Sequence, residues 1–498
     1  MDFLDPRKRR SHKIRLFIGY FLVSIAIGLA TIILVYGAYG YGIDTKTGEI
    51  VQNGLLFLDS KPGGAEIYLN GTDQKSTTSA RLILQAGNYT MTLKKSGYRD
   101  WQRTFSLDEH SVARYVYPLL FPTTPLEAKL KDYTSAPALV TETPDQHWLL
   151  VQDPDSSDGT ITFHEYDTSN LTRAVTTPVN LTLPTSVLSD SGASSQLSVV
   201  EWSTDNNHVL LKHTLAGGDE YIVFNRDKPA DSFNVNKMFS VSPSQVALRN
   251  KKIDQLYIYS QSAGTVQLGD TGKGTLADPL LSQVLAFKPY GTDLMTYVTD
   301  KNAADGMVQA RIWNNGQTYP LYTFKAGTQY LIDAAQYSGH WYYVAGSNAE
   351  QRVNVYEDPL NSLKNPSVAK AVPLLALNEL GATKLGFSTN ARFIEVESGQ
   401  NFAVYDAETQ SNYNYSLQAP LAAPMSWMDG HRLIGESAGQ VFVMDYDATN
   451  QQSLVGTIEP SGGLFSHDYN HLLTFDQKDG ATELMNVDMR AGTDLPKQ

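Results

Sequence analysis

The sequence predicts a mainly β protein with a single N-terminal transmembrane helix, then a small β-sandwich, then a β-propeller of eight blades, with seven as the alternative. Three observations support this prediction. An uncharged run of 28 residues extends from Leu16 to Ile43. Short strands bounded by turn residues follow it. From residue 138 onward, a strand–turn–strand pattern recurs about every 40–50 residues, a period typical of propeller blades.

The uncharged run is long enough to cross a bilayer, because about 20 apolar residues span the hydrocarbon as a helix. Six Lys and Arg residues lie within residues 1–15, and such residues favour the cytoplasmic side. We therefore expect residues 1–15 to be a basic cytoplasmic tail, residues 16–43 to be an uncleaved signal anchor, and the remaining chain to be extracytoplasmic. The alternative is a signal peptide cleaved near Gly37, although its apolar region normally spans only about 7–15 residues.

Composition excludes several classes of function. The chain has 498 residues and a net charge of −13, and residues 16–498 alone carry −17. An acidic body of this kind argues against nucleic acid as a partner, because phosphates require a basic surface. The absence of cysteine excludes a disulfide scaffold, thiol chemistry and Cys-ligated metal sites. A chain of this length also needs more than one core or a repeat architecture.

Residues 53–120 read as a small β-sandwich, because turn signals recur every 8–12 residues between short alternating strands. The predicted strands are Gly54–Asp59, Ala65–Leu69, Ala80–Leu84, Tyr89–Lys94 and Val112–Tyr117.

The turn residues of this unit resemble those of the PEGA domain. The similar segments are Ser60–Ala65, Ile67–Gly71, Gly87-Asn88-Tyr89 and Gly97-Tyr98 through Trp101. Gly63 replaces the glutamate of the family's Pro-Glu-Gly-Ala turn, and Ser79-Ala80 replaces its usual Thr-Pro. The resemblance implies a small sandwich of bacterial envelope proteins that acts as a non-catalytic binding or spacer module. We expect Tyr98 and Trp101 to lie in its core, the alternative being an exposed aromatic platform.

Residues 121–137 contain three prolines and are predicted to be a linker. Residues 138–498 are predicted to form the propeller, with Ala136–Val140 as the strand that closes the ring. Eight similar segments begin at His147, His208, Ser244, Asp293, His340, Arg392, His431 and His471. The segment at Ser244 is an insertion if the blades number seven.

Several repeats begin with an aromatic residue, a small or polar residue and a turn, as at Trp202, Phe387, Trp427 and Phe465. This start resembles the TolB-type propeller repeat, a relative of the WD-type blades.

Three motifs suggest chemistry, but each has a simpler structural interpretation. Gly435–Gly439 matches the G-x-S-x-G nucleophile motif around Ser437, but a strand follows where a hydrolase has a helix, so we expect a hairpin turn. Residues Asp153 to Gly159 imitate a calcium loop, but they fall on another turn between strands and lack the EF-hand spacing. The histidines that precede strands recur at one repeat position, as turn residues do. We therefore predict no catalytic, cofactor-binding or metal-binding residue, and no cofactor.

The functional hypothesis is a membrane-anchored, extracytoplasmic binding or scaffolding protein of the bacterial cell envelope, without catalysis. Its expected partners are the lipid bilayer and an envelope protein or glycan. One alternative is a hydrolase or lyase that acts on envelope glycan or peptide, with its site at the propeller axis. Another is a sensor, which would need a cytoplasmic partner because residues 1–15 are too few for a signalling domain.

Overall fold

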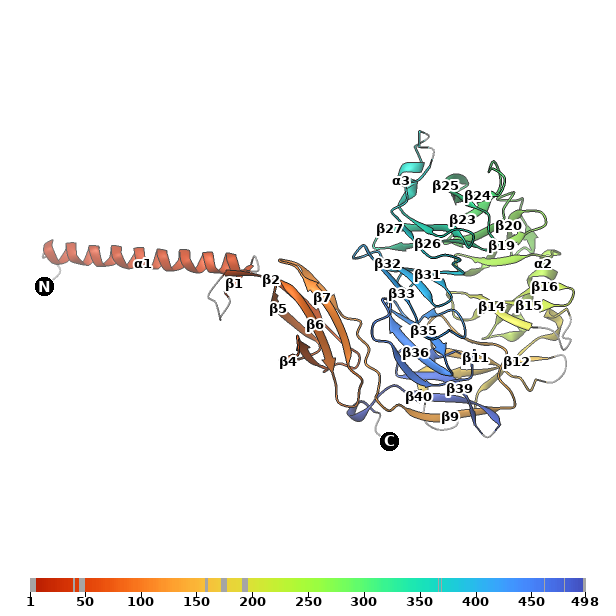
Figure 1. The fold of residues 1–498 in the computed structure, drawn as a ribbon, viewed down its shortest axis with the longest axis horizontal. Helices are drawn as coiled ribbons and strands as arrows, with labels where there is room; N and C mark the ends of the chain where they lie inside the picture. Colours follow the sequence, from red (N-terminus) through yellow and green to blue (C-terminus); the bar gives the residue numbers. More distant parts are fainter. Residues whose placement is uncertain are drawn as a thin grey trace. The chain divides into compact units, whose positions relative to one another are not determined.

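The computed structural model describes residues 6–38, 41–43, 50–156, 160–171, 177–189, 196–365, 367–368, 370–460, 462–478 and 480–495. The protein is mainly β (Figure 1). It divides into two compact units, of which the first comprises Met1–Thr124 with Arg490–Gln498, and the second comprises Pro125–Met489.

The first unit begins with the helix α1 (Pro6–Ala38), whose segment Lys13–Gly37 is long and apolar enough to cross a membrane. Every described side chain of that segment is exposed, so none contributes to the core of the protein. The helix ends before the end of the predicted span, because Tyr41–Ile43 forms strand β1. Glycines at 37, 40 and 42 lower helix propensity there, which explains the earlier end.

Two four-stranded sheets make up the β part of the first unit. In one sheet, β2 pairs with β1 and β5 antiparallel and with β8 in parallel, and the other has the order β4-β3-β6-β7. The strands are β2 (Ile50–Leu58), β3 (Glu66–Leu69), β4 (Thr72–Thr77), β5 (Ala80–Gln85), β6 (Gly87–Lys94), β7 (Trp101–Leu107) and β8 (Val112–Tyr115). Strand β4 was not predicted, because its sequence TDQKST has no apolar alternation.

The two sheets share one apolar core, to which both contribute alternate residues. Trp101 is 1% exposed and Tyr98 is 4% exposed, so the prediction that these aromatic residues pack inside is confirmed. Strand β2 passes close to the end of β7 at Gly54, where a Cβ atom would lie 2.6 Å from Cγ of Leu107. Only glycine allows this approach.

The C-terminal segment also belongs to the first unit. The backbone N–H of Ala491 donates to Oη of Tyr98 at 2.8 Å, and Nζ of Lys95 lies 3.3 Å from Oδ2 of Asp494. The last propeller strand ends at Asp488, so the predicted propeller boundary at residue 498 is wrong. Residues 490–495 instead pack on the sandwich that precedes the propeller in sequence.

The second unit is a β-propeller of eight four-stranded sheets among the described residues, which agrees with the predicted fold class. The strands of blades 1 to 4 are β10 (Val140–Glu142), β11 (Trp148–Gln152), β12 (Ile161–Asp167), β13 (Val179–Leu183); β14 (Gln196–Trp202), β15 (His208–Leu215), β16 (Gly218–Asn225), β17 (Phe233–Asn234); β18 (Gln245–Arg249), β19 (Lys252–Ser260), β20 (Thr265–Asp270), β21 (Thr275–Leu276); and β22 (Ala286–Tyr290), β23 (Leu294–Thr299), β24 (Met307–Asn314), β25 (Gln317–Lys325).

Blades 5 to 8 continue the pattern. Their strands are β26 (Tyr330–Tyr337), β27 (His340–Ser347), β28 (Val353–Glu357), β29 (Leu375–Leu377); β30 (Lys384–Phe387), β31 (Phe393–Ser398), β32 (Asn401–Asp406), β33 (Ser411–Ser416); β34 (Ser426–Trp427), β35 (Arg432–Ser437), β36 (Gln440–Asp445), β37 (Gln452–Gly456); and β38 (Leu464–Phe465), β39 (His471–Lys478), β40 (Ala481–Asp488) with β9 (Leu126–Tyr133). The short helix α2 (Val235–Phe239) lies in the connection from blade 2 to blade 3. A second short helix, α3 (Pro359–Leu363), lies within blade 5 between β28 and β29.

The closing strand is β9, which pairs antiparallel with β40 and completes blade 8 (Figure 1). The predicted closing strand, Ala136–Val140, is wrong, since Val140 begins the first strand of blade 1. Strand β9 lies within the predicted linker 121–137. Its sequence LEAKLKDY alternates apolar and charged residues, and only Leu130 and Tyr133 are buried.

The segment at Ser244 belongs to a complete blade, so the ring has eight blades rather than seven. It differs from the other repeats because it supplies the first and second strands of its blade, β18 and β19. The other repeat segments supply the second and third strands, as β11 and β12 do in blade 1. This offset explains why the aromatic start is missing at Ser244.

Apolar cores join each pair of neighbouring blades from blade 1 to blade 7. One such core joins blade 8 to blade 1 through β9, so the ring closes by side-chain packing as well as by backbone pairing. Tyr133, at the end of β9, is 2% exposed, and its Oη lies 3.0 Å from Oη of Tyr166 in blade 1 and 3.2 Å from Nδ1 of His164.

We predict that Tyr133→Ala lowers the free energy of unfolding of the propeller by about 3–5 kcal/mol, because it leaves a cavity at the closing seam. Tyr133→Phe removes only the hydroxyl and should cost about 1 kcal/mol. Leu126→Ala is the matched control, because Leu126 lies on the same strand but is 40% exposed. Urea unfolding measures all three variants. Equal, small losses for Tyr133→Ala and Leu126→Ala would contradict closure through this seam.

Candidate axial binding site

The first strands of the blades line the propeller axis. Within the described part of the chain, β14 contacts β18, β18 contacts β22, β22 contacts β26, and β26 contacts β30. The first strands of blades 2 to 6 therefore stand at the inner edges of their blades, and the propeller architecture implies the same position for the remaining first strands. Side chains on these strands and on the turns beside them can meet at the axis although they are far apart in sequence.

Several first strands carry charged residues. Lys288 on β22 lies 3.6 Å from Asp333 on β26, and Lys251 pairs with Glu201 on β14. Burial raises the pKa of Asp333, and the nearby Lys288 opposes this rise. The inner wall of blades 2 to 5 therefore contains acids that are already neutralised by bases.

Blades 7, 8 and 1 differ, because they enclose a cavity of about 280 Å³ at their inner strands. Glu142 of β10, Trp427 of β34 and Leu464 of β38 line it, together with Gln146 and Glu436. Pro460, Gly462 and Gly463 complete the wall just before β38. None of the described lining residues is a lysine or an arginine, so the glutamates carry the only formal charges on this described wall.

Both glutamates of this cavity, which we call the axial pocket, have raised pKa values. Burial raises the pKa of Glu142 to about 7, while a hydrogen bond of 3.3 Å from Nε2 of Gln146 opposes the rise. Burial also raises the pKa of Glu436, and the backbone of Gly462 opposes this by hydrogen bonding. Glu436 is only 6% exposed, and its Oε1 has no hydrogen-bond partner among the described residues.

An unpaired acceptor of this kind is uncommon in a folded protein, because a buried polar atom without a partner costs about 1–3 kcal/mol. Such a cost is often retained where a ligand supplies the missing donor. The axial pocket thus offers acceptors and an aromatic side chain, Trp427, to a ligand that carries donors or positive charge.

A second group of buried charges lies behind Trp427. Glu395 is fully buried, and neither of its oxygens has a hydrogen-bond partner among the described residues. Nζ of Lys384 lies 3.7 Å from Glu395 and 3.6 Å from Glu397. Burial raises the pKa of both glutamates, with Lys384 opposing.

Gly386 lies between Trp427 and Glu395. A Cβ atom at Gly386 would lie 3.4 Å from Oε2 of Glu395 and 3.6 Å from Nε1 of Trp427, which also lacks a described partner. The buried glutamates therefore lie directly behind the aromatic wall of the axial pocket.

A larger hollow of about 940 Å³ lies between blades 2 and 3, beside Glu220. The carboxylate of Glu220 is already engaged, because it accepts hydrogen bonds from Ser189, His213 and Asn234. The axial pocket is the better candidate site despite its smaller size, because Oε1 of Glu436 has no hydrogen-bond partner among the described residues.

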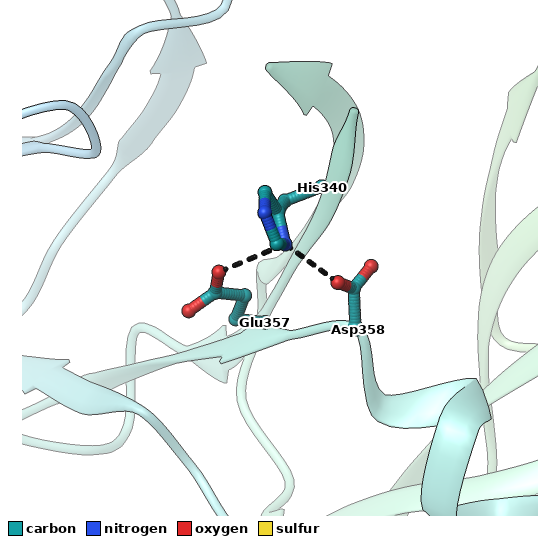
Figure 2. A group of neighbouring side chains, drawn as sticks. All are labelled: His340, Glu357 and Asp358. Atoms are coloured by element: carbon teal, nitrogen blue, oxygen red, sulfur yellow. Dashed lines mark hydrogen bonds and ion pairs between the residues drawn. The ribbon is translucent and has the colours of Figure 1, made fainter. Parts of the chain in front are cut away.

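His340, Glu357 and Asp358 form a separate group on blade 5 that has the composition of a metal site (Figure 2). Nδ1 of His340 lies 2.8 Å from Asp358 and 3.1 Å from Glu357. The same histidine–aspartate pairing occurs at two other blade turns, between His147 and Asp145 and between His208 and Asp205. A turn-stabilising role therefore explains the group without a metal ion, and no metal site is assigned to it.

The motif around Ser437 occupies a hairpin turn. Oγ of Ser437 donates to the backbone carbonyl of Pro420 at 2.7 Å, and Ser437 ends β35 in a hairpin with β36, which accounts for it without a nucleophilic role. In the imitation calcium loop, Asp153 accepts from the backbone N–H of Asp155 and lies 3.5 Å from His164. Ser157, Asp158 and Gly159 lie outside the described residues.

Sequence reasoning did not identify Glu142, Glu395 or Glu436. Glu395 alone has a recognisable signal in the sequence, because it interrupts an apolar strand between Ile394 and Val396. A charged residue in a strand that is buried on both faces is rare unless it is paired or functional. Glu142 stands in a short polar segment and offers no such signal.

We predict that Glu142→Gln changes stability in a pH-dependent way. The folded pKa of Glu142 is about 7, above its ordinary 4.5, so between these values the folded state binds more protons than the unfolded state. The free energy of unfolding of the native protein therefore falls as pH rises through this window, and Gln removes that loss. Tm should be higher in the variant at pH 8, by about 2–4 °C for each kcal/mol, with a smaller difference at pH 5.

The exposed Asp278 supplies the control for this experiment, since Asp278→Asn also removes one acidic group from the propeller. It should leave Tm nearly unchanged at both pH values. An equal effect of Glu142→Gln at pH 5 and pH 8 would contradict the raised pKa.

Comparison with solved structures shows distant similarity to propeller-like proteins. Oligogalacturonate lyase in complex with manganese is 8% identical, covering 74% of this chain and 98% of that chain with a TM-score of 0.38. KlHsv2 with loop 6CD replaced by a Gly-Ser linker is 10% identical, covering 65% and 98%, with a TM-score of 0.38. A chain of the mitotic checkpoint complex is 10% identical, covering 74% and 93%, with a TM-score of 0.33.

Among curated proteins, none matches this chain. The family model of the PEGA domain matches residues 53–119, which are the β-sandwich of the first unit. The protein thus contains a PEGA domain between an apolar N-terminal helix and an eight-bladed propeller.

Proposed function

We propose that the protein is a single-pass binding protein of the bacterial cell envelope, which holds a ligand bearing a protonated amine in its axial pocket. One observation carries the proposal: the pocket presents Glu142, Glu436 and Trp427, and none of its described lining residues is a lysine or an arginine. The expected partner is an envelope protein or glycan, recognised through a lysine side chain or an amino sugar.

The proposed membrane topology is inferred from two features of the first unit. The apolar segment Lys13–Gly37 is a candidate span, and the six bases within residues 1–15 favour retention of the N-terminus in the cytoplasm. The PEGA domain and the propeller follow the helix and are then extracytoplasmic. In this arrangement α1 is an uncleaved signal anchor.

The ligand chemistry follows from the groups left unsatisfied in the pocket. An ammonium group has only donors, so it can supply the hydrogen bond that Oε1 of Glu436 lacks. A cation beside Glu142 would also favour the ionised form of that carboxyl group, which burial disfavours. The face of a tryptophan attracts cations as well, by about 0.5–2 kcal/mol. A cavity of 280 Å³ admits one side chain or one sugar ring rather than a folded partner.

An enzyme is the second candidate, and the pKa of Glu142 favours it. A carboxyl group with a pKa of about 7 is suited to donate or accept a proton near neutral pH. In this account, the protein would cleave envelope glycan or peptide at the axis. If the native protein releases soluble fragments from isolated envelope and the Glu142→Gln variant does not, the result would favour the enzyme over the binding protein.

The binding proposal is tested with the full-length protein in nanodiscs and with Nα-acetyl-lysine amide as the probe, whose side-chain amine is free. We expect binding at pH 8, and about tenfold weaker binding at pH 5, because Glu142 is then protonated while the amine keeps its charge. Glu436→Gln should weaken binding at pH 8 by about tenfold or more, since the charged acceptor is lost. Isothermal titration calorimetry provides the affinities.

Two controls accompany this experiment. N-acetyl-norleucine amide has a similar side-chain length without the amine and should not bind. Ser437→Ala, which changes a hydroxyl in a nearby hairpin turn, should leave the affinity unchanged. Equal binding of both probes, or an affinity that does not depend on Glu436, would refute the proposal.

A further inference from the structure

One face of the PEGA domain exposes apolar side chains together with arginines. It is the outward face of the sheet formed by β2, β5 and β8, opposite the shared core. Ile83, Val112 and Val116 are 66%, 53% and 61% exposed. Large apolar residues exposed together usually mark a contact surface. We call this surface, with Leu55, Phe57, Arg81 and Arg114, the β2-β5-β8 face.

The strand register places these residues in two rows. Ile83 and Val112 stand on either side of Leu55, and Arg81 and Arg114 stand on either side of Phe57. Both guanidinium groups lie over the Phe57 ring, at 5.9 Å and 5.0 Å from its centre. The face thus combines an aliphatic row with an arginine–aromatic–arginine row. Asp59 follows at the end of β2, where it accepts a hydrogen bond from Ser79.

The charge of this region differs from that of the rest of the extracytoplasmic chain. Residues 50–119 contain eight Lys and Arg against six Asp and Glu, whereas residues 120–498 contain 24 against 42. A surface that is locally basic and apolar fits a partner that is anionic and has an apolar interior. A bilayer with anionic headgroups has both properties.

Chain geometry keeps this face close to the membrane that α1 is proposed to span. Gly37 ends the candidate span, and Tyr41 lies four residues further, which is at most about 14 Å. Tyr41 pairs with Gln52 on β2, about 5 Å away, and Leu55 lies about 10 Å along that strand. Leu55 is therefore within roughly 30 Å of the end of the span, and the face can reach the headgroups.

From these observations we infer that the β2-β5-β8 face of the PEGA domain rests on the anionic outer surface of the membrane. The aliphatic row enters the headgroup layer, and Arg81 and Arg114 pair with lipid phosphates. The inference rests on the proposed function in one respect, the insertion of α1. It adds that the PEGA domain is itself a lipid-binding module rather than only a spacer.

The test uses the full-length protein in vesicles of phosphatidylglycerol and phosphatidylcholine. The chain has no cysteine, so a fluorescent label can be placed at one position at a time by Ile83→Cys or Val116→Cys. The control is Ser106→Cys on the outward face of β7 in the other sheet, where Ser106 is exposed. A quencher attached to lipid headgroups should quench the labels at 83 and 116 strongly and the label at 106 weakly. Equal quenching at all three positions would overturn the inference.

A second measurement does not require insertion of α1. Residues 41–498 retain every described core residue, because the side chains described in α1 are all exposed. This fragment should sediment with phosphatidylglycerol vesicles and not with phosphatidylcholine vesicles. Arg81→Gln with Arg114→Gln should weaken that binding about tenfold or more.

The charge-matched control for this pair is Lys75→Gln with Lys94→Gln, which removes two positive charges from the other sheet. It should leave vesicle binding unchanged. Equal losses for the two pairs, or absence of fragment binding, would overturn the inference. Carbonate extraction of the full-length protein reports separately on the span, so failure of the anchor and failure of the face are distinguishable.

Discussion

The pairing of β9 with β40 is the interaction on which the propeller depends. Strand β9 comes from the start of the propeller unit and completes the last blade, with backbone pairs from Leu126 opposite Asp488 to Tyr133 opposite Thr482. Without it, β40 would be a free sheet edge, and the core between blades 8 and 1 would lose Leu130 and Tyr133. The axial pocket also depends on the pairing of β9 with β40, because Glu142 belongs to blade 1 and Leu464 to blade 8.

In blade 6, one buried acid is fully hydrogen-bonded and another is not. In the same blade, Arg392 holds Asp406 by two hydrogen bonds of 2.8 Å and 2.6 Å, so that pair is well satisfied. Among the described residues Glu395 accepts no comparable hydrogen bond, although it is fully buried and Nζ of Lys384 lies 3.7 Å away. Burying a carboxyl group without hydrogen bonds destabilises a fold, and proteins tolerate this mainly where function requires it. The carboxyl group without hydrogen bonds therefore lies behind Trp427, whereas Asp406 in the same blade is satisfied.

Much of the fold could be predicted, because its signals are local. The apolar run, the turns of the PEGA domain and the recurring strands each follow from short stretches of sequence. The closing strand could not be predicted, since Lys129, Lys131 and Asp132 make its sequence look like a solvated linker. It becomes a strand through its pairing with residues 482–488, and that partner lies about 350 residues away. The end of the propeller was misplaced for a similar reason, because residues 490–495 return to Tyr98.

The axial pocket lay beyond sequence reasoning for the same physical reason. Its acids are residues 142 and 436, and only the closed ring brings them to one cavity. By contrast, the local motif around Ser437 was correctly attributed to a hairpin turn, because the strands that flank it are visible in the sequence. A motif within one hairpin can be interpreted from a short stretch of sequence. A site at the axis is formed by residues of several blades and requires the closed ring.

Hydrogen–deuterium exchange of the full-length protein, with and without an amine-bearing ligand, tests the central claim most directly. If the ligand binds at the axis between blades 7, 8 and 1, exchange should slow in residues 140–147, 424–436 and 462–465, which line or flank the axial pocket. Blades 3 to 5 should keep their exchange rates. Protection confined to other blades, or none at saturating ligand, would contradict a binding site at the propeller axis.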